Sequence, residues 1–187
     1  MKKIKGRLVK RASQTQLNID SNDEWSKYDE RLFEYIQQDN LTKLKSTLLK
    51  KGISVVKLSP IGTTAVHFAC EKQNPQCLEV LLNEQPDLSV LDKTGCHALS
   101  VAAKVGSLEC MRQLLQYNSE IITLQDYHKK TALHYAAGKG HFECVQLLLE
   151  NTDNLDIRDK VSLINILISM TYRRTLFGHV ITAVSIS

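Results

Sequence analysis

Apolar residues recur with helical spacing in three short blocks of similar sequence. The blocks are QCLEVLL (76–82), ECMRQLL (109–115) and ECVQLLL (143–149). In the first block Leu78, Leu81 and Leu82 lie at positions i, i+3 and i+4, which predicts an amphipathic helix with one apolar stripe. An apolar run rich in small residues precedes each block and predicts a second, shorter helix. These runs are TTAVHFAC (63–70), CHALSVAA (96–103) and KTALHYAA (130–137).

The pair of helices repeats with a fixed period, and a short turn precedes each copy. Equivalent turn positions fall 33 or 34 residues apart, at Ser59, Asp92, Asp126 and Asp159. Gly62 and Gly95 follow three residues later, where glycine supplies the positive φ that a tight turn needs. The predicted caps of the first helix are Thr64 and Thr131 at its start and Gly106 and Gly140 at its end. A unit this small must stack on its neighbours to bury its stripe, which predicts a solenoid.

The last copy carries two short motifs that are typical of one repeat family. In DYHKKTALHYAAGKGHFECVQLLLENTDNLDIRDK (126–160), TALH (131–134) begins the first helix and GKGH (138–141) joins the two helices. On these motifs the sequence resembles the ankyrin repeats, with Ala132 where the family has proline. The other departures are Ser59, Gln73, His97, Ser100 and Lys129, which weaken individual turns. The resemblance implies an all-α ankyrin-repeat solenoid whose turn tips and first helices bind other proteins.

The periodicity divides the chain into six segments. Two short amphipathic helices with a polar outer face are predicted around Asp39 and Asn40, and we interpret them as a helical cap of the array. The segments are residues 1–24, a basic and polar disordered N-terminus; 25–57, a degenerate capping repeat; 58–91, 92–125 and 126–158, three ankyrin repeats; and 159–187, an irregular apolar tail.

The tail departs from the repeat pattern. Ser162 and Ile164 stand where a further copy would have glycine and threonine, and VSLINILISM (161–170) is apolar and uncharged. This run is too short to cross a bilayer. Two interpretations stay open: an alternative ending that encodes no ankyrin structure, or a divergent C-terminal cap.

The residues before the repeats carry a narrower resemblance. MKKIKGRLVKR (1–11) and EWSKYDERL (24–32), followed by the repeats, are similar to ankyrin-repeat and coiled-coil proteins of the ankycorbin and uveal-autoantigen type. That resemblance implies association with the actin cortex and the cytoskeleton. Because the chain has no heptad region, the resemblance makes it a truncated form, and a truncated product without independent function is one alternative.

Composition narrows the function classes without identifying a partner. Apolar residues make up 43% and charged residues 24% of the chain, as in ordinary globular proteins, and the net charge of +4 is too small to indicate nucleic-acid binding. The basic start lacks the apolar region of a signal peptide. The five cysteines are an odd number, which favours a cytoplasmic protein with reduced thiols over a disulfide-stapled secreted one.

The cysteines that share one repeat position are predicted to pack in the core. Cys77, Cys110 and Cys144 lie on equivalent helices, and stacked helices are about 8–10 Å apart. That spacing is too wide for a single zinc ion or a disulfide. We therefore expect no metal site and no disulfide among them.

No arrangement of nucleophile and base stands out. His67 and His134 follow Thr64 and Thr131 by three residues, and in ankyrin repeats this pair ties the turn to the helix start. His67 could contact Cys70 on one helix, but Cys70 occupies an alanine position of the core, which favours burial over catalysis. Cys96, in a predicted turn, is the thiol expected to be most reactive. The sequence therefore predicts no enzyme, no cofactor and no small-molecule substrate.

Two surfaces are candidates for contact with other molecules. The turn tips and first helices are expected to bind another protein. Because lysines and histidines are frequent there, a partner with an acidic segment is favoured. The candidate contact residues are Lys93, His97, Val101, Lys104, Tyr127, His128, Lys130, Tyr135 and Lys139. The N-terminal segment is a candidate anchor to an anionic membrane surface at the cell cortex, through Lys2, Lys3, Lys5, Arg7, Lys10 and Arg11. Protein binding as an intracellular adaptor or scaffold is the main prediction, and the peripheral membrane or actin-cortex role is its alternative.

Overall fold

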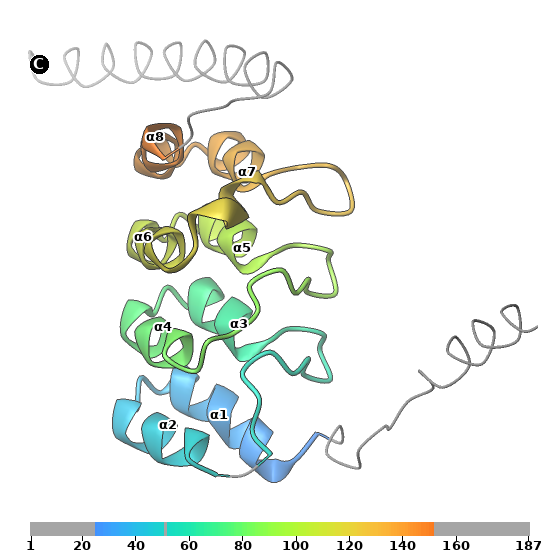
Figure 1. Cartoon of the computed structure of the whole chain (residues 1–187), viewed down its shortest axis with the longest axis vertical. Helices are drawn as coiled ribbons and strands as arrows, with labels where there is room; N and C mark the ends of the chain where they lie inside the picture. Colours follow the sequence, from blue (N-terminus) through green and yellow to red (C-terminus); the bar gives the residue numbers. More distant parts are fainter. Residues whose placement is uncertain (1–24, 51, 152–187) are drawn as a thin grey trace, which may run out of the picture.

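Helix–turn–helix pairs stack into an elongated array (Figure 1). The computed structural model describes residues 25–50 and 52–151. Their elements are α1 (Lys27–Gln37), α2 (Leu41–Leu48), α3 (Ala65–Glu71), α4 (Pro75–Leu82), α5 (Ala98–Val105), α6 (Leu108–Tyr117), the 3-10 turn η1 (Ser119–Thr123), α7 (Ala132–Lys139) and α8 (Phe142–Glu150). Every regular element in the described ranges is helical, so the predicted all-α solenoid is confirmed.

The helices form two layers. The inner layer consists of α1, α3, α5 and α7, and the outer layer of α2, α4, α6 and α8; within each layer, successive helices pack on one another. The connections between pairs project from the inner-layer side as hairpin-like loops (Figure 1). We call the loops at residues 59–63, 92–96 and 126–130 the three fingers.

Local contacts define where the helices begin and end. The Oγ1 atom of Thr64 accepts a hydrogen bond from the N–H three residues on at 3.3 Å, and Oδ1 of Asn74 does the same at 2.9 Å. Gly106 and Gly140 end α5 and α7 in the left-handed conformation, with φ of +77° and +78°. Gln73 takes the same conformation after α3, with φ of +54°. The predicted caps at Thr64, Gly106 and Gly140 are therefore present, and Thr131 occupies the N-cap position of α7. A glutamine replaces the usual glycine in the first repeat.

The first helix pair is joined to the array by a buried ion pair and by aromatic contacts. Asp29 accepts a hydrogen bond from the N–H of Ser26 at 2.7 Å, closing a capping box at the start of α1. The same carboxylate lies 3.0 Å from the ammonium of Lys57, and both side chains are nearly buried. The ring of Phe33 packs against that of Phe68 in the next pair at an interplanar angle of 45°, with ring centroids 5.1 Å apart. These contacts attach α1 and α2 to the repeats.

The core runs between the layers as a continuous row of alanine, leucine, valine and cysteine side chains. Cys77, Cys110 and Cys144 are at most 1% exposed, as the sequence predicted for core residues. None of the helices in residues 25–50 and 52–151 is long and apolar enough to span a bilayer. The predictions for residues 1–24 and 159–187 lie outside the described residues.

Candidate functional site

The second and third fingers are built around aspartates whose carboxylates bond to their own turns. Oδ1 of Asp92 accepts from the N–H groups of Thr94 at 2.8 Å and Cys96 at 2.9 Å. Oδ1 of Asp126 accepts from the N–H groups of His128 and Lys130, both at 2.8 Å. The carboxylates thus accept hydrogen bonds from their own fingers, and the lysines at the tips are exposed to solvent.

Successive fingers pack against each other through their glycines. The N–H of Lys93 donates to the carbonyl oxygen of Gly62 at 2.7 Å. A Cβ built on Gly62 would lie 2.6 Å from Cβ of Lys93, and one on Gly95 would lie 2.2 Å from a ring carbon of Tyr127. The fingers therefore form one continuous surface. Tyr127 covers Gly95 on one side and is 69% exposed on the other.

Tyr135 joins the third finger to α5 and α7. Its hydroxyl donates to the carboxylate of Asp126 and accepts from the thiol of Cys96, with sulfur and oxygen 3.5 Å apart. The ammonium groups of Lys104 and Lys130 lie 5.8 and 5.9 Å from the centroid of its ring, within cation–π range. Two lysines from different repeats are therefore held beside one half-buried aromatic ring.

This cluster perturbs the ionisation of its members. Burial and the hydrogen bond to Asp126 raise the pKa of Tyr135, so the phenol stays protonated. Burial alone would raise the pKa of Asp126, but the hydrogen bonds from Tyr135, Lys130 and His128 outweigh it and lower that pKa. The Asp126 carboxylate is therefore ionised and held by these hydrogen bonds, while the side chains of Lys104 and Lys130 are exposed.

Eight of the nine predicted contact residues are at least partly exposed. Lys93, Lys104, Tyr127, His128, Lys130 and Lys139 are exposed, and Val101 and Tyr135 are half-buried. The sequence prediction omitted Lys129, which is exposed beside Lys130 at the third fingertip. Its position between two predicted contact residues was the available signal.

Two of the sequence predictions at the base of the second finger were wrong. His97, the N-cap residue of α5, is 6% exposed and therefore offers little surface to a partner. Its Nδ1 atom is buried and has no hydrogen-bond partner in the described residues. Cys96 is 2% exposed and bonded to Tyr135, so it is shielded from reagents and is not a reactive thiol.

The remaining histidine and cysteine candidates have structural contacts. His67 bonds through Nδ1 to the hydroxyl of Thr64 at 2.7 Å and through Nε2 to the carbonyl oxygen of Cys96 at 3.0 Å. It therefore ties the first repeat to the second. Contact with Cys110 and burial raise the pKa of the Cys70 thiol, which disfavours the thiolate that nucleophilic attack needs. No group of three or more metal-ligating side chains occurs in residues 25–50 and 52–151.

A family model described as ankyrin repeats, in three copies, matches residues 32–125 and 67–160. The chain belongs to the ankyrin-repeat family. Its repeats are therefore protein-interaction modules, and the family is typically noncatalytic. The match covers both helix layers and the three fingers.

The chain is similar, over part of its length, to several differently named proteins. The chain is 37% identical over 86 residues to a probable E3 ubiquitin-protein ligase, XBOS31, of Oryza sativa subsp. japonica, which is 46% of this chain and 19% of the ligase. It is 33% identical over 113 residues to the B-cell lymphoma 3 protein homolog of Mus musculus, covering 58% and 25% of the two chains. The chain thus spans a quarter or less of the length of these relatives.

The narrower resemblance is confirmed by one relative. The chain is 34% identical over 97 residues to the uveal autoantigen with coiled-coil domains and ankyrin repeats of Mus musculus, covering 48% of this chain and 7% of that protein. The aligned part is short, so it supports similarity of the repeats and carries no statement about the activity of the whole protein.

Charge is sorted between the inner and outer surfaces of the three repeats. The fingers and inner helices of the three repeats, residues 58–73, 92–106 and 126–140, hold six lysines against three acidic residues. These are Lys72, Lys93, Lys104, Lys129, Lys130 and Lys139, against Glu71, Asp92 and Asp126. The outer helices of the same three repeats, α4, α6 and α8, and their following loops hold Glu79, Glu84, Asp87, Glu109, Glu120, Glu143 and Glu150 against Arg112. The inner surface of the three repeats is therefore basic and their outer surface acidic.

Proposed function

We propose that this chain is a noncatalytic adaptor or scaffold that binds an acidic segment of another protein across its second and third fingers and the inner helices α5 and α7. The observation that carries the proposal is the cluster around Tyr135, where Lys104 and Lys130 lie within 6 Å of one ring centroid. A carboxylate bound there meets two ammonium groups and an apolar ring face. Lys93 and Tyr127 extend the same surface along the fingertips.

The two aspartates of this surface do not oppose an acidic partner strongly. Asp92 and Asp126 are held by N–H groups of their own fingers, whereas the lysine side chains are exposed. Complementary charge of this kind accelerates association and selects partners more than it adds affinity. Binding is therefore expected to weaken as the salt concentration rises.

The charge reversal Lys130→Glu tests this proposal. The full chain is used as bait in affinity capture from cell lysate, and the captured protein is then titrated against each variant. We expect Lys130→Glu to weaken binding by about 1 kcal/mol, roughly fivefold, with the melting temperature nearly unchanged because the side chain is exposed. Lys45→Glu, an exposed lysine of outer helix α2, is the matched control. Equal affinities for Lys130→Glu and Lys45→Glu would contradict the proposed site.

The membrane alternative rests on residues 1–11, which lie outside the described residues. A location at the cytoplasmic face of the cell cortex stays a prediction from Lys2, Lys3, Lys5, Arg7, Lys10 and Arg11. The membrane alternative predicts that the full chain sediments with anionic liposomes at low salt and is released at high salt. Equal sedimentation after deletion of residues 1–11 would exclude the anchor.

A further inference from the structure

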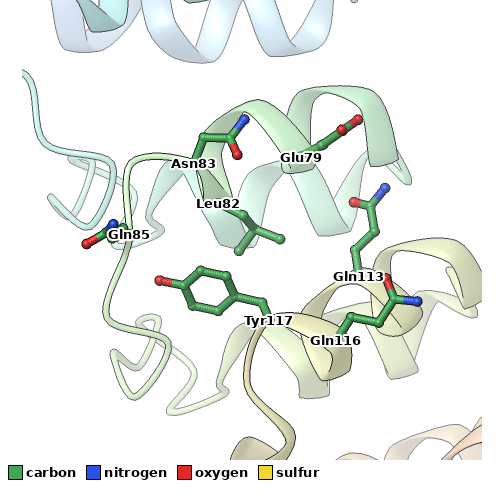
Figure 2. Close-up of a pocket in the computed structure, with 7 residues that line it drawn as sticks. All are labelled: Glu79, Leu82, Asn83, Gln85, Gln113, Gln116 and Tyr117. Atoms are coloured by element: carbon green, nitrogen blue, oxygen red, sulfur yellow. The ribbon is translucent and has the colours of Figure 1, made fainter.

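A groove lies between α4 and α6 on the outer layer, away from the fingers. Its volume is about 380 Å³. Leu82 from α4 and Tyr117 from α6 face each other across it and form its apolar part (Figure 2). The polar part consists of Glu79 and of four side-chain amides, those of Asn83, Gln85, Gln113 and Gln116.

Gln113 is a polar residue at a repeat position that is aliphatic in the other two repeats. It follows Cys110 by three residues, as Val80 follows Cys77 in the first repeat and Leu147 follows Cys144 in the third. Val80 and Leu147 are buried, at 8% and 7% exposed. The second repeat thus places a primary amide where the neighbouring repeats bury an aliphatic side chain.

The amide of Gln113 is also incompletely bonded. Its Oε1 atom is buried and accepts no hydrogen bond from the residues that the structure describes. A buried acceptor without a donor is unfavourable and rare in folded proteins. When the side chain turns toward the groove, an N–H group of a ligand can bond to this oxygen and remove the penalty.

The other groove residues specify the kind of ligand. A primary amide donates and accepts at once, so it matches the alternating N–H and C=O groups of an extended peptide backbone. Four such amides, two from α6 and two from the residues that follow α4, can therefore hold backbone without requiring a particular side chain. Leu82 and the ring of Tyr117, which is 40% exposed, offer apolar contact.

Charge selects one side chain of that peptide. Glu79 lines the groove, and the outer surface around it is acidic. The one arginine of the outer helices and loops, Arg112, lies 3.6 Å from Glu109 on its own helix and does not line the groove. We propose that this groove binds an extended segment of a partner protein that carries an arginine or lysine beside Glu79. The site is separate from the basic finger surface and has the opposite charge preference.

The test uses the full chain, labelled with nitrogen-15, and three pools of blocked octapeptides. Each pool fixes arginine, alanine or glutamate at a central position and mixes the other positions. The side-chain NH₂ resonances of the four groove amides report binding directly. We expect these resonances to shift most with the arginine pool, which should bind roughly tenfold more tightly than the glutamate pool at low salt.

Three variants of the full chain assign the binding to the groove. Gln113→Val restores the residue type of the neighbouring repeats, so it should keep or raise the melting temperature while weakening the arginine pool at least about fivefold. Glu79→Gln should bind all three pools about equally, because it removes only the charge. Gln146→Ala, at an exposed glutamine of α8, is the control and should behave as the parent chain.

The contrary outcomes are distinct from those of the proposed function. The groove is refuted if the arginine pool leaves the four NH₂ resonances unmoved, or if Gln113→Val binds it as tightly as the parent chain. Binding that is lost in Lys130→Glu and kept in Gln113→Val would also overturn it, because the peptide would then lie on the finger surface.

Discussion

Replacing Lys129 with glycine should stabilise the third finger. Lys129 has φ of +59°, and its N–H donates to the carbonyl oxygen of Asp126 at 3.0 Å. In the other two fingers Gly62 and Gly95 make the equivalent bond at 2.7 and 2.9 Å, with φ of +71° and +76°. The lysine therefore holds a left-handed conformation that glycine adopts without strain.

The expected gain is the difference between two backbone terms. A side chain in the left-handed region costs about 1–2 kcal/mol of stability. Glycine costs about 0.5–1 kcal/mol of stability, because it raises the entropy of the unfolded chain. The side chain of Lys129 is exposed, so its removal loses little packing. We expect a net gain of about 0.5–1 kcal/mol, and about 1 kcal/mol shifts the melting temperature of a chain of this size by roughly 2–4 °C.

Urea unfolding followed by circular dichroism measures the effect, and Lys129→Ala is the matched variant. Alanine removes the same charge and the same long side chain but keeps a Cβ in the left-handed conformation. Lys129→Gly should therefore be the more stable of the two, with the same dependence on urea concentration. Equal stability of the glycine and alanine variants would refute the strain argument.

Three further perturbations test other contacts. Gly95 has a positive φ, and the Cβ of Gly95→Ala would lie 2.2 Å from a ring carbon of Tyr127. This variant should lose about 2 kcal/mol of unfolding free energy, measured with urea. The control Gly138→Ala has open space around its Cβ and should gain up to about 1 kcal/mol. Asp29→Ala removes the carboxylate that lies 3.0 Å from the nearly buried ammonium of Lys57 and should lose about 1.5–3 kcal/mol in urea unfolding; a loss under about 1 kcal/mol would show that the pair is well solvated. Burial lowers the pKa of His67 below 6.5, so the unfolded state binds the proton more readily and the melting temperature should fall as the pH drops through that value. His67→Asn should flatten this fall, and an unchanged slope would assign it to other groups.

The helices and their ends were predictable because their signals act over short distances. The apolar stripe of α4, the cap at Thr64 and the stop at Gly106 each depend on residues within about one helical turn. The stacking also followed from the sequence, because a unit with one apolar stripe needs a neighbour to bury it. Repetition then multiplied each local signal three times.

The base of the second finger was not predictable for the opposite reason. The sequence predicts His97 as a surface contact residue, but His97 is 6% exposed at the N-cap of α5. The thiol of Cys96 is covered by Tyr135, 39 residues later in the chain. Both outcomes depend on how one repeat packs on the next. The amide at Gln113 is a further case, since its significance emerges only when Val80 and Leu147 are known to be buried there.

The repeat period explains why charge is sorted between the inner and outer surfaces of the three repeats. A period of 33 or 34 residues returns each repeat position to the same layer, so a charge at any finger position adds to the charges already on that surface. Lys93 and Lys129 accumulate on the fingers in this way, and Glu109 and Glu143 at the starts of the outer helices. The finger surface and the outer groove can therefore change independently. The first depends on long-range charge and should weaken strongly with salt, whereas hydrogen bonds from the groove amides are short-ranged and should weaken much less.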